Sequence, residues 1–93
     1  MDILEELRRV IRLEARALTQ LEESLNSRFE EAVRMLQACR GKVILMGVGK
    51  SGLIANKIAA TMVSTGTPAV FLHGSEGMHG DIGIVAKDDI VIA

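Results

Sequence analysis

The first forty residues contain neither glycine nor proline, and their apolar residues recur at helical spacing. This pattern predicts a long amphipathic helix with one narrow apolar stripe. Its leucines and Ile11 also fit a heptad seam, which is broken where Glu14 stands at an apolar position. Acidic and basic residues cover the other faces, and we expect Glu5 to pair with Arg8 and Arg9. The stripe is formed by Leu4, Leu7, Val10, Ile11, Leu18, Leu21 and Leu25.

The stretch NSRFEEA interrupts this pattern, and a second helix is predicted to begin within it. Ser27 followed by Glu30 forms a capping box, so the helix should begin there and run to about Arg40, where Gly41 ends it. Residues 1–40 are therefore interpreted as a helical hairpin. Such a hairpin could simply cover its own domain, but a long Leu stripe is also what a subunit interface needs. We favour oligomerisation.

After Gly41 the pattern changes to that of an α/β unit. KVILMG and AVFL each read as a buried strand, DIVIA reads as a third, and a helix over residues 50–64 should join the first two. Gly66 and Pro68 end that helix. A strand–helix–strand order predicts an open parallel sheet over residues 41–93. The expected buried side of the helix is Leu53, Ile54, Ile58, Ala59, Met62 and Val63.

The chain stops in the apolar strand DIVIA, and three strands make a thin parallel sheet, which needs helices on both faces. We therefore expect this chain to be the N-terminal part of a longer protein.

Composition narrows the classes of function. The net charge is −1 and only two residues are aromatic, so neither a basic surface nor stacking platforms for nucleic acid are present. A single cysteine, Cys39, excludes an internal disulfide and fits a reducing compartment. The acidic N-terminus is not a secretory signal, and no apolar run approaches the roughly 20 residues of a membrane span. We expect a soluble, cytoplasmic protein that binds neither nucleic acid nor membranes.

The loop GVGKSG, between the first strand and the helix, resembles two nucleotide motifs and completes neither. A P-loop needs glycine where this chain has Ile44. A dinucleotide fold needs an acidic residue at the end of the second strand, where Leu72 and His73 stand. What remains is an anion site at a helix N-terminus. Its expected members are the glycines Gly47, Gly49 and Gly52, the cation Lys50, and the hydroxyl of Ser51.

The segment HGSEGMHGDIG places both histidines of the chain, with Glu76 and Asp81, on the loop that leaves the second strand. This loop should emerge at the same sheet edge as the Gly47–Gly52 loop. The spacing of His73, Glu76 and His79 suits either proton transfer or a divalent metal, although it matches no standard zinc spacing. The alternative is a glycine-rich loop whose histidines are ordinary polar groups.

Taken in order, GKVILMGVGKSG, STGTP and HGDIGIVAKDDIVIA closely resemble the sugar isomerase (SIS) domain of the bacterial D-arabinose-5-phosphate isomerases. The resemblance implies a flavodoxin-like, nucleotide-free fold and interconversion of ribulose 5-phosphate and arabinose 5-phosphate for the lipopolysaccharide sugar Kdo. It also implies a homotetramer, no required cofactor, and inhibition by zinc. The implied catalytic residue is Lys50. The implied substrate contacts are Gly66, Thr67, His73 and His79, of which His73 can also hold metal. We expect Ser51 of the anion loop to contact the substrate with them.

Two features qualify what the resemblance implies. Gly74 stands where the family usually has proline, and the family's Ser-rich phosphate loop and main base would lie beyond Ala93, so we expect little isomerase activity from these 93 residues alone. In a parallel sheet, Gly66 and Thr67 lie at the edge opposite the Gly47–Gly52 loop, which favours a site shared between subunits. The alternatives are a non-catalytic sugar-phosphate sensor and another phosphosugar isomerase.

Overall fold

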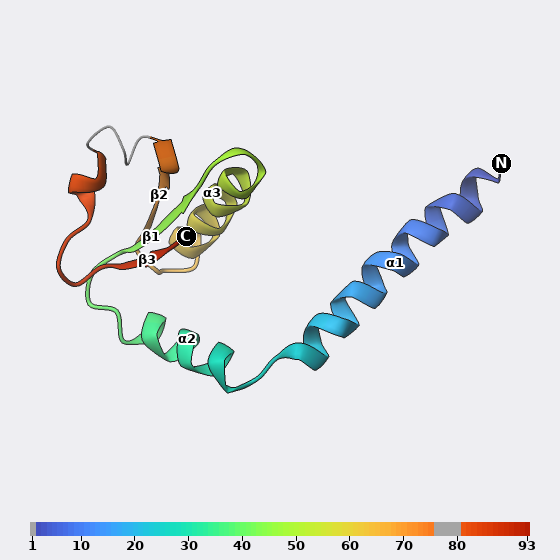
Figure 1. Cartoon of the computed structure of the whole chain (residues 1–93), viewed down its shortest axis with the longest axis horizontal. Helices are drawn as coiled ribbons and strands as arrows, with labels where there is room; N and C mark the ends of the chain where they lie inside the picture. The colour runs from blue at the N-terminus through green and yellow to red at the C-terminus, as the bar shows by residue number, and fades with distance from the viewer. Residues whose placement is uncertain (1, 76–80) are drawn as a thin grey trace. The chain divides into compact units, whose positions relative to one another are not determined.

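The structure, a computed structural model, describes residues 2–75 and 81–93 (Figure 1). Its backbone divides into two compact units, Met1–Val33 and Arg34–Ala93. The first contains helix α1 and most of α2, and the second contains the sheet. The elements in chain order are α1 (Ile3–Ser24), α2 (Ser27–Gln37), β1 (Val43–Gly47), α3 (Gly49–Ser64), β2 (Ala69–His73), the 3₁₀ helix η1 (Asp81–Ile84) and β3 (Ile90–Ile92).

Helix α1 is the long helix that the apolar stripe predicts. It begins at Asp2, whose carboxylate accepts a hydrogen bond from the Glu5 backbone N–H at 3.2 Å. The expected ion pair of Glu5 with Arg8 is present at 3.9 Å. The expected pair of Glu5 with Arg9 is wrong, because Arg9 Nε donates to Glu6 at 2.9 Å and holds the pKa of that carboxyl below its usual value. No residue of α1 is buried, and the leucines of its apolar stripe are exposed.

Helix α2 begins at Ser27 as predicted, but the capping side chain is that of Asn26 instead of Ser27, since the Asn26 side-chain oxygen accepts from the Arg28 N–H at 2.9 Å. It ends at Gln37 rather than near Arg40. After Gln37 the backbone tightens, with the Cys39 N–H donating to Leu36 O at 3.2 Å. Leu36 and Cys39 then pack against the sheet's hydrophobic core, which is why the second unit begins within α2, before the predicted boundary at residue 41.

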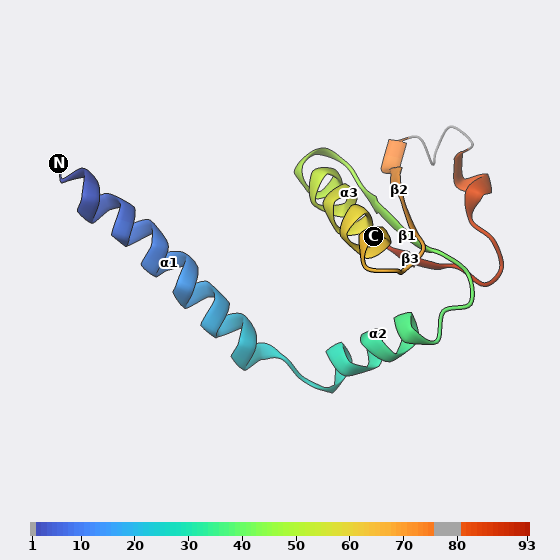
Figure 2. The same ribbon diagram turned by 180° about the vertical axis from the view of Figure 1, so that it is seen from behind.

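The three strands form the predicted parallel sheet, in the order β2-β1-β3. Figures 1 and 2 show β1 between its two neighbours and α3 running beside them. Val43, Ile44 and Leu45 are at most 2 % exposed, so the central strand is buried on both faces, as its continuous apolar run predicts. Gly47 at the end of β1 is in register with His73 at the end of β2.

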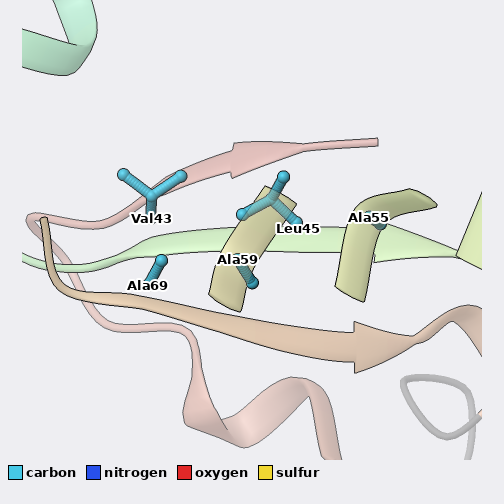
Figure 3. Packing of buried hydrophobic residues seen from close by; sticks show 5 residues of the cluster. All are labelled: Val43, Leu45, Ala55, Ala59 and Ala69. Carbon is cyan, nitrogen blue, oxygen red and sulfur yellow. The ribbon is translucent and has the colours of Figure 1, made fainter. Parts of the chain in front are cut away.

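The core between α3 and the sheet is built from small residues on the helix side. Val43 and Leu45 of β1 and Ala69 of β2 pack against Ala55 and Ala59 of α3 (Figure 3). Small residues let the helix axis approach the sheet closely, and close contact is what makes dispersion effective.

The predicted buried side of α3 is therefore correct only in part. Ala59 is buried and Met62 packs against the core, but Leu53, Ile54, Ile58 and Val63 are exposed. The helix turns Gly52 and Ala55 to the sheet instead. A prediction from hydrophobicity alone places leucine and isoleucine in the core ahead of alanine. The space between this helix and the parallel sheet is narrow, however, so the smaller residues are the ones buried there.

The amino-terminal edge of the sheet is held by the Asp89 carboxylate, which we call the Asp89 clasp. This carboxylate accepts from the backbone N–H and the Nζ of Lys42, at 2.8 and 2.7 Å, and from the Ala86 N–H at 2.7 Å. The Lys42 side chain, followed by the two N–H groups, lowers the pKa of Asp89 to about 2. Gly41 lies against this turn so closely that a Cβ there would come within 2.8 Å of the Asp88 carbonyl. The clasp joins the start of β1 to the start of β3.

Within the described residues, no helix combines the length and the apolar character that crossing a bilayer requires.

Candidate functional site

A cavity of about 450 Å³ opens at the carboxyl edge of β1 and β2. Both predicted segments reach it, since Lys50 stands in the first turn of α3, directly after β1, and His73 ends β2. The prediction that the two loops meet at one sheet edge is confirmed. This is also the edge at which open α/β sheets bind ligands. The cavity is lined by Gly49, Lys50, Gly52, Leu53, Asn56, Phe71 and His73.

The three loop glycines serve two different purposes. A Cβ on Gly47 would lie 2.9 Å from backbone atoms of Ser51 and Gly52, and one on Gly52 would lie 3.0 Å from Gly47 O. These two glycines therefore let the strand end and the helix start touch. Gly49 has φ +59°, a left-handed conformation that side chains disfavour, and it turns the chain into α3.

The N-terminus of α3 lies beside the cavity, and its first hydrogen-bond donors have no partner among the described residues. The N-cap residue is Val48, which offers no side-chain acceptor, and the first intrahelical bond runs from the Gly52 N–H to Val48 O at 3.2 Å. The N–H groups of the first three helical residues therefore have no acceptor within the helix. No acidic residue lies in the first turn, and Lys50 adds a second positive charge. Partial and full positive charge together suit an anionic ligand.

Ser51 is placed differently from Lys50. Its hydroxyl donates to Val48 O at 2.8 Å, and the side chain does not line the cavity. A hydroxyl engaged in this way holds the first turn of α3. Its predicted contact with substrate stays a prediction.

His73 is oriented by a local hydrogen-bond pair. Its Nδ1 lies 3.2 Å from the Ser75 backbone nitrogen and 2.7 Å from the Ser75 hydroxyl. A backbone N–H can only donate, so Nδ1 is the acceptor and the neutral ring carries its proton on Nε2. The ring also stands edge-on to Phe71, with centroids 6.4 Å apart. In this state His73 offers a hydrogen-bond donor at Nε2 and no free basic nitrogen.

Gly66 and Thr67 lie far from this cavity within the same unit. They close the other end of α3 in a Schellman motif, in which the Thr67 N–H donates to Met62 O at 2.8 Å and the Gly66 N–H to Val63 O at 3.2 Å. Gly66 has φ +98°, as this motif requires. The five-residue β2 separates them from His73 by about 15 Å at roughly 3.3 Å per residue. One chain does not bring the two predicted groups of substrate contacts together.

Several predicted residues of the histidine segment are not among those that the structure describes. Glu76 and His79 lie outside the described residues, as does the side chain of Asp81. In the part of the chain that is described, no three His, Cys, Asp or Glu side chains are grouped as a metal would need. Of the predicted metal ligands, only His73 is described, and its Nδ1 is already engaged by Ser75.

Sequence reasoning missed two polar or aromatic walls of the cavity, Asn56 and Phe71, and assigned Leu53 to the core. The sequence nevertheless contained a signal for all three of these residues. Gly49, Leu53 and Asn56 stand at i, i+4 and i+7 and therefore share one face of α3. Phe71 alternates with Leu72 along β2 and so points to the α3 side of the sheet with His73.

Comparison with known proteins agrees with this arrangement. The family model described as "SIS domain" matches residues 35–93. The arabinose 5-phosphate isomerase KdsD of Yersinia pestis is 48 % identical over 86 residues, which are 92 % of this chain and 26 % of that protein. KdsD of Pseudomonas aeruginosa is 43 % identical over 93 residues, which are 100 % of this chain and 28 % of that protein. The chain thus spans about a quarter of the length of these curated relatives.

A solved structure shares the fold closely. A protein of E. coli CFT073 in complex with arabinose 5-phosphate superposes with a TM-score of 0.89 at 48 % identity, over 97 % of this chain and 48 % of the other. The parallel sheet, the glycine loop after β1 and the match of the family model to residues 35–93 together establish the family. The chain belongs to the SIS domain family.

Proposed function

We propose that the protein carrying this chain is an aldose–ketose isomerase that interconverts D-arabinose 5-phosphate and D-ribulose 5-phosphate. The observation that carries the proposal is the cavity in which Lys50 and His73 meet at the N-terminus of α3. Relatives named arabinose 5-phosphate isomerase, and the related structure in complex with arabinose 5-phosphate, support the choice of sugar. The reaction would supply the precursor of Kdo for lipopolysaccharide synthesis, in the cytoplasm.

Lys50 is proposed to stabilise the enediolate oxygen. Isomerisation moves a proton between C1 and C2 and leaves negative charge on the neighbouring oxygen. An ammonium group beside the donor-rich start of α3 would stabilise that charge. Removing one such contact typically costs about 10²–10³ in kcat.

His73 is proposed to orient the sugar by donating from Nε2 to one of its oxygen atoms. The Ser75 contacts occupy Nδ1, so His73 is a poor candidate for the base that takes the carbon-bound proton. We propose that the main base is provided outside these 93 residues and that His79 assists ring opening. Together these roles need no cofactor. Inhibition by zinc through His73 would require the ring to break its contact with Ser75, because Nδ1 accepts from Ser75 and Nε2 carries the proton in the described state.

The substrate site is proposed to lie between subunits of a homo-oligomer, expected to be a tetramer. Gly66 and Thr67 stand at the sheet edge opposite Lys50 and His73, so their substrate contacts would be made to a sugar bound at another subunit. A site divided in this way would make activity depend on assembly.

The direct test is Lys50→Ala in the full-length protein, assayed for conversion of arabinose 5-phosphate. We expect kcat to fall by about 10²–10³ with little change in KM, because the contact forms mainly in the transition state. The matched control is Lys57→Ala, which removes the same charge from an exposed position on the same helix, outside the cavity lining. Near-normal turnover of Lys50→Ala would overturn the role of Lys50.

The alternatives predict other outcomes in the same assay. A sugar-phosphate sensor would bind arabinose 5-phosphate without converting it. Another phosphosugar isomerase would convert a different aldose phosphate faster. Either result with the unaltered protein would overturn the proposed reaction while leaving the family assignment intact.

A further inference from the structure

The turn after β2 brings Ser75 back onto the ring of His73. Gly74 lies close to the junction between β1 and α3, because a Cβ there would come within 3.0 Å of Val48 Cγ1. His73 is half-buried, and the Phe71 ring stands edge-on to it with centroids 6.4 Å apart. The imidazole is therefore held by Phe71 within β2 and by Ser75 in the turn that follows.

We propose that Ser75 is a positioning residue that determines which chemistry His73 can perform. It keeps the ring a hydrogen-bond donor toward the cavity and withholds both ring nitrogens from divalent metal ions. The consequence for the sugar rests on the proposed function, whereas the state of the ring and its response to metal do not.

Two groups of Ser75 meet the same ring nitrogen. The hydroxyl oxygen lies 2.7 Å from Nδ1, and the backbone nitrogen lies 3.2 Å from it. A hydroxyl can rotate to accept a proton as well as to donate one, but a backbone N–H can only donate. The N–H therefore makes Nδ1 an acceptor, the hydroxyl donates to Nδ1 in the same state, and the ring proton stays on Nε2.

A metal ion is disfavoured at either nitrogen. Zinc binds an imidazole lone pair at about 2 Å, and at Nδ1 that position is already filled by the Ser75 hydroxyl. Binding at Nε2 would move the proton to Nδ1, where a metal-bound histidine needs an acceptor for its other N–H. The Ser75 backbone N–H offers a donor there instead. Lys50 lines the same cavity and adds a positive charge, which also opposes a cation.

The same arrangement suits an anionic ligand rich in oxygen atoms. The Nε2–H of His73, the ammonium of Lys50 and the first N–H groups of α3 are all hydrogen-bond donors beside one cavity. Donors fixed in advance stabilise negative charge that develops on a sugar oxygen. Ser75 thus makes His73 a member of this donor set, although Ser75 itself does not line the cavity.

Nitrogen NMR of isotope-labelled histidines tests the state of the ring. The full-length protein is measured in alkaline buffer, where imidazole rings are neutral, and the His73 signals are assigned by their loss in His73→Gln. We expect a bare Nδ1 and a protonated Nε2. Ser75→Asp should reverse the two, because a carboxylate only accepts and favours the proton on Nδ1. Ser75→Thr keeps a hydroxyl and should retain the native pattern. A proton on Nδ1 in the unaltered protein, or no reversal in Ser75→Asp, would overturn the proposal.

Zinc titration against a chromophoric chelator tests the exclusion of metal. Ser75→Asp should bind zinc about tenfold to a hundredfold more tightly than the unaltered protein, because it supplies the acceptor that a metal-bound histidine needs. The double variant Ser75→Asp, His73→Ala keeps the added charge without the ring, and the gain should vanish in it. Ser75→Thr should bind zinc as the unaltered protein does. Absence of a gain, or a gain that persists without the ring, would show that Ser75 does not control His73.

Conversion of arabinose 5-phosphate by the unaltered protein is measured separately from both experiments. A protein with the expected ring state and zinc response that converts no sugar would contradict the proposed function and leave the role of Ser75 intact. A protein that converts the sugar but carries its ring proton on Nδ1 would contradict the role of Ser75 alone.

Discussion

The two edges of the sheet differ in whether their polar groups are already hydrogen-bonded within the chain. At the amino-terminal edge, the Asp89 carboxylate has donors on both oxygens and its side chain is only 3 % exposed. At the carboxyl edge, Lys50 is exposed beside a cavity, and the first N–H groups of α3 have no acceptor within the helix. Satisfied polar groups stabilise a fold, whereas unsatisfied donors beside a cavity are available to a ligand. We infer that one edge contributes stability and the other contributes binding.

The largest expected effect is at the junction between β1 and α3. Gly47→Ala would place a Cβ 2.9 Å from backbone atoms of Ser51 and Gly52, so strand end and helix start must separate. We expect a loss of about 2–3 kcal/mol in the free energy of unfolding, measured by urea denaturation. Gly83→Ala is the control, because a Cβ there meets no described atom within 4 Å. Equal stability of the two variants would show that the junction tolerates a side chain.

A smaller effect is expected at the opposite edge, from Asp89→Asn. The pKa of Asp89 is lowered to about 2, below the ordinary value of about 4, so the unfolded chain binds its proton at higher pH than the folded chain does. The contribution to stability is therefore complete above about pH 4 and is lost as the pH falls toward 2. The Tm difference between the protein and Asp89→Asn should be largest at neutral pH and shrink on acidification.

The neighbouring residue provides the control for this experiment. Asp88 is exposed, and its described hydrogen bonds use the backbone carbonyl, so Asp88→Asn should leave Tm nearly unchanged. A Tm difference for Asp89→Asn that stays constant between about pH 6 and pH 3 would contradict the assignment of the low pKa to the clasp.

The smallest loss of stability is expected for substitution of Gly66, where a side chain would strain only the backbone conformation. Its φ of +98° suits glycine, but a Cβ would meet no atom within 4 Å. Gly66→Ala should cost about 1 kcal/mol of the free energy of unfolding, and Gly66→Asn less, because asparagine tolerates the left-handed region better. If substrate contacts at Gly66 are also made, activity should fall in both variants by more than the stability change explains.

Much of the fold could be predicted because its elements follow local patterns. The apolar period of α1, the three apolar strands and the break at Gly66 are each visible within a few residues, and all the predicted helices and strands are present. Two details differ: α2 ends at Gln37 before the predicted stop at Gly41, and β3 is largely exposed although its apolar run predicts burial. The parallel sheet follows from the strand–helix–strand order, and with it the meeting of the Lys50 and His73 loops at one edge. Chain order and handedness leave few other topologies.

What the sequence determined by itself was therefore the order of elements, the glycine-rich start of α3 with its lysine, and the sheet edge that this start shares with His73. Only the tertiary structure decided which face of α3 is buried, how Asn56 and Phe71 complete the cavity, and that Asp89 clasps Lys42 from 47 positions away. The physical reason is the separation along the sequence between the residues that decide each feature. Helical period and glycine conformation depend on neighbours in the chain, whereas helix-to-sheet spacing and the partner of a buried carboxylate depend on segments that meet only after folding.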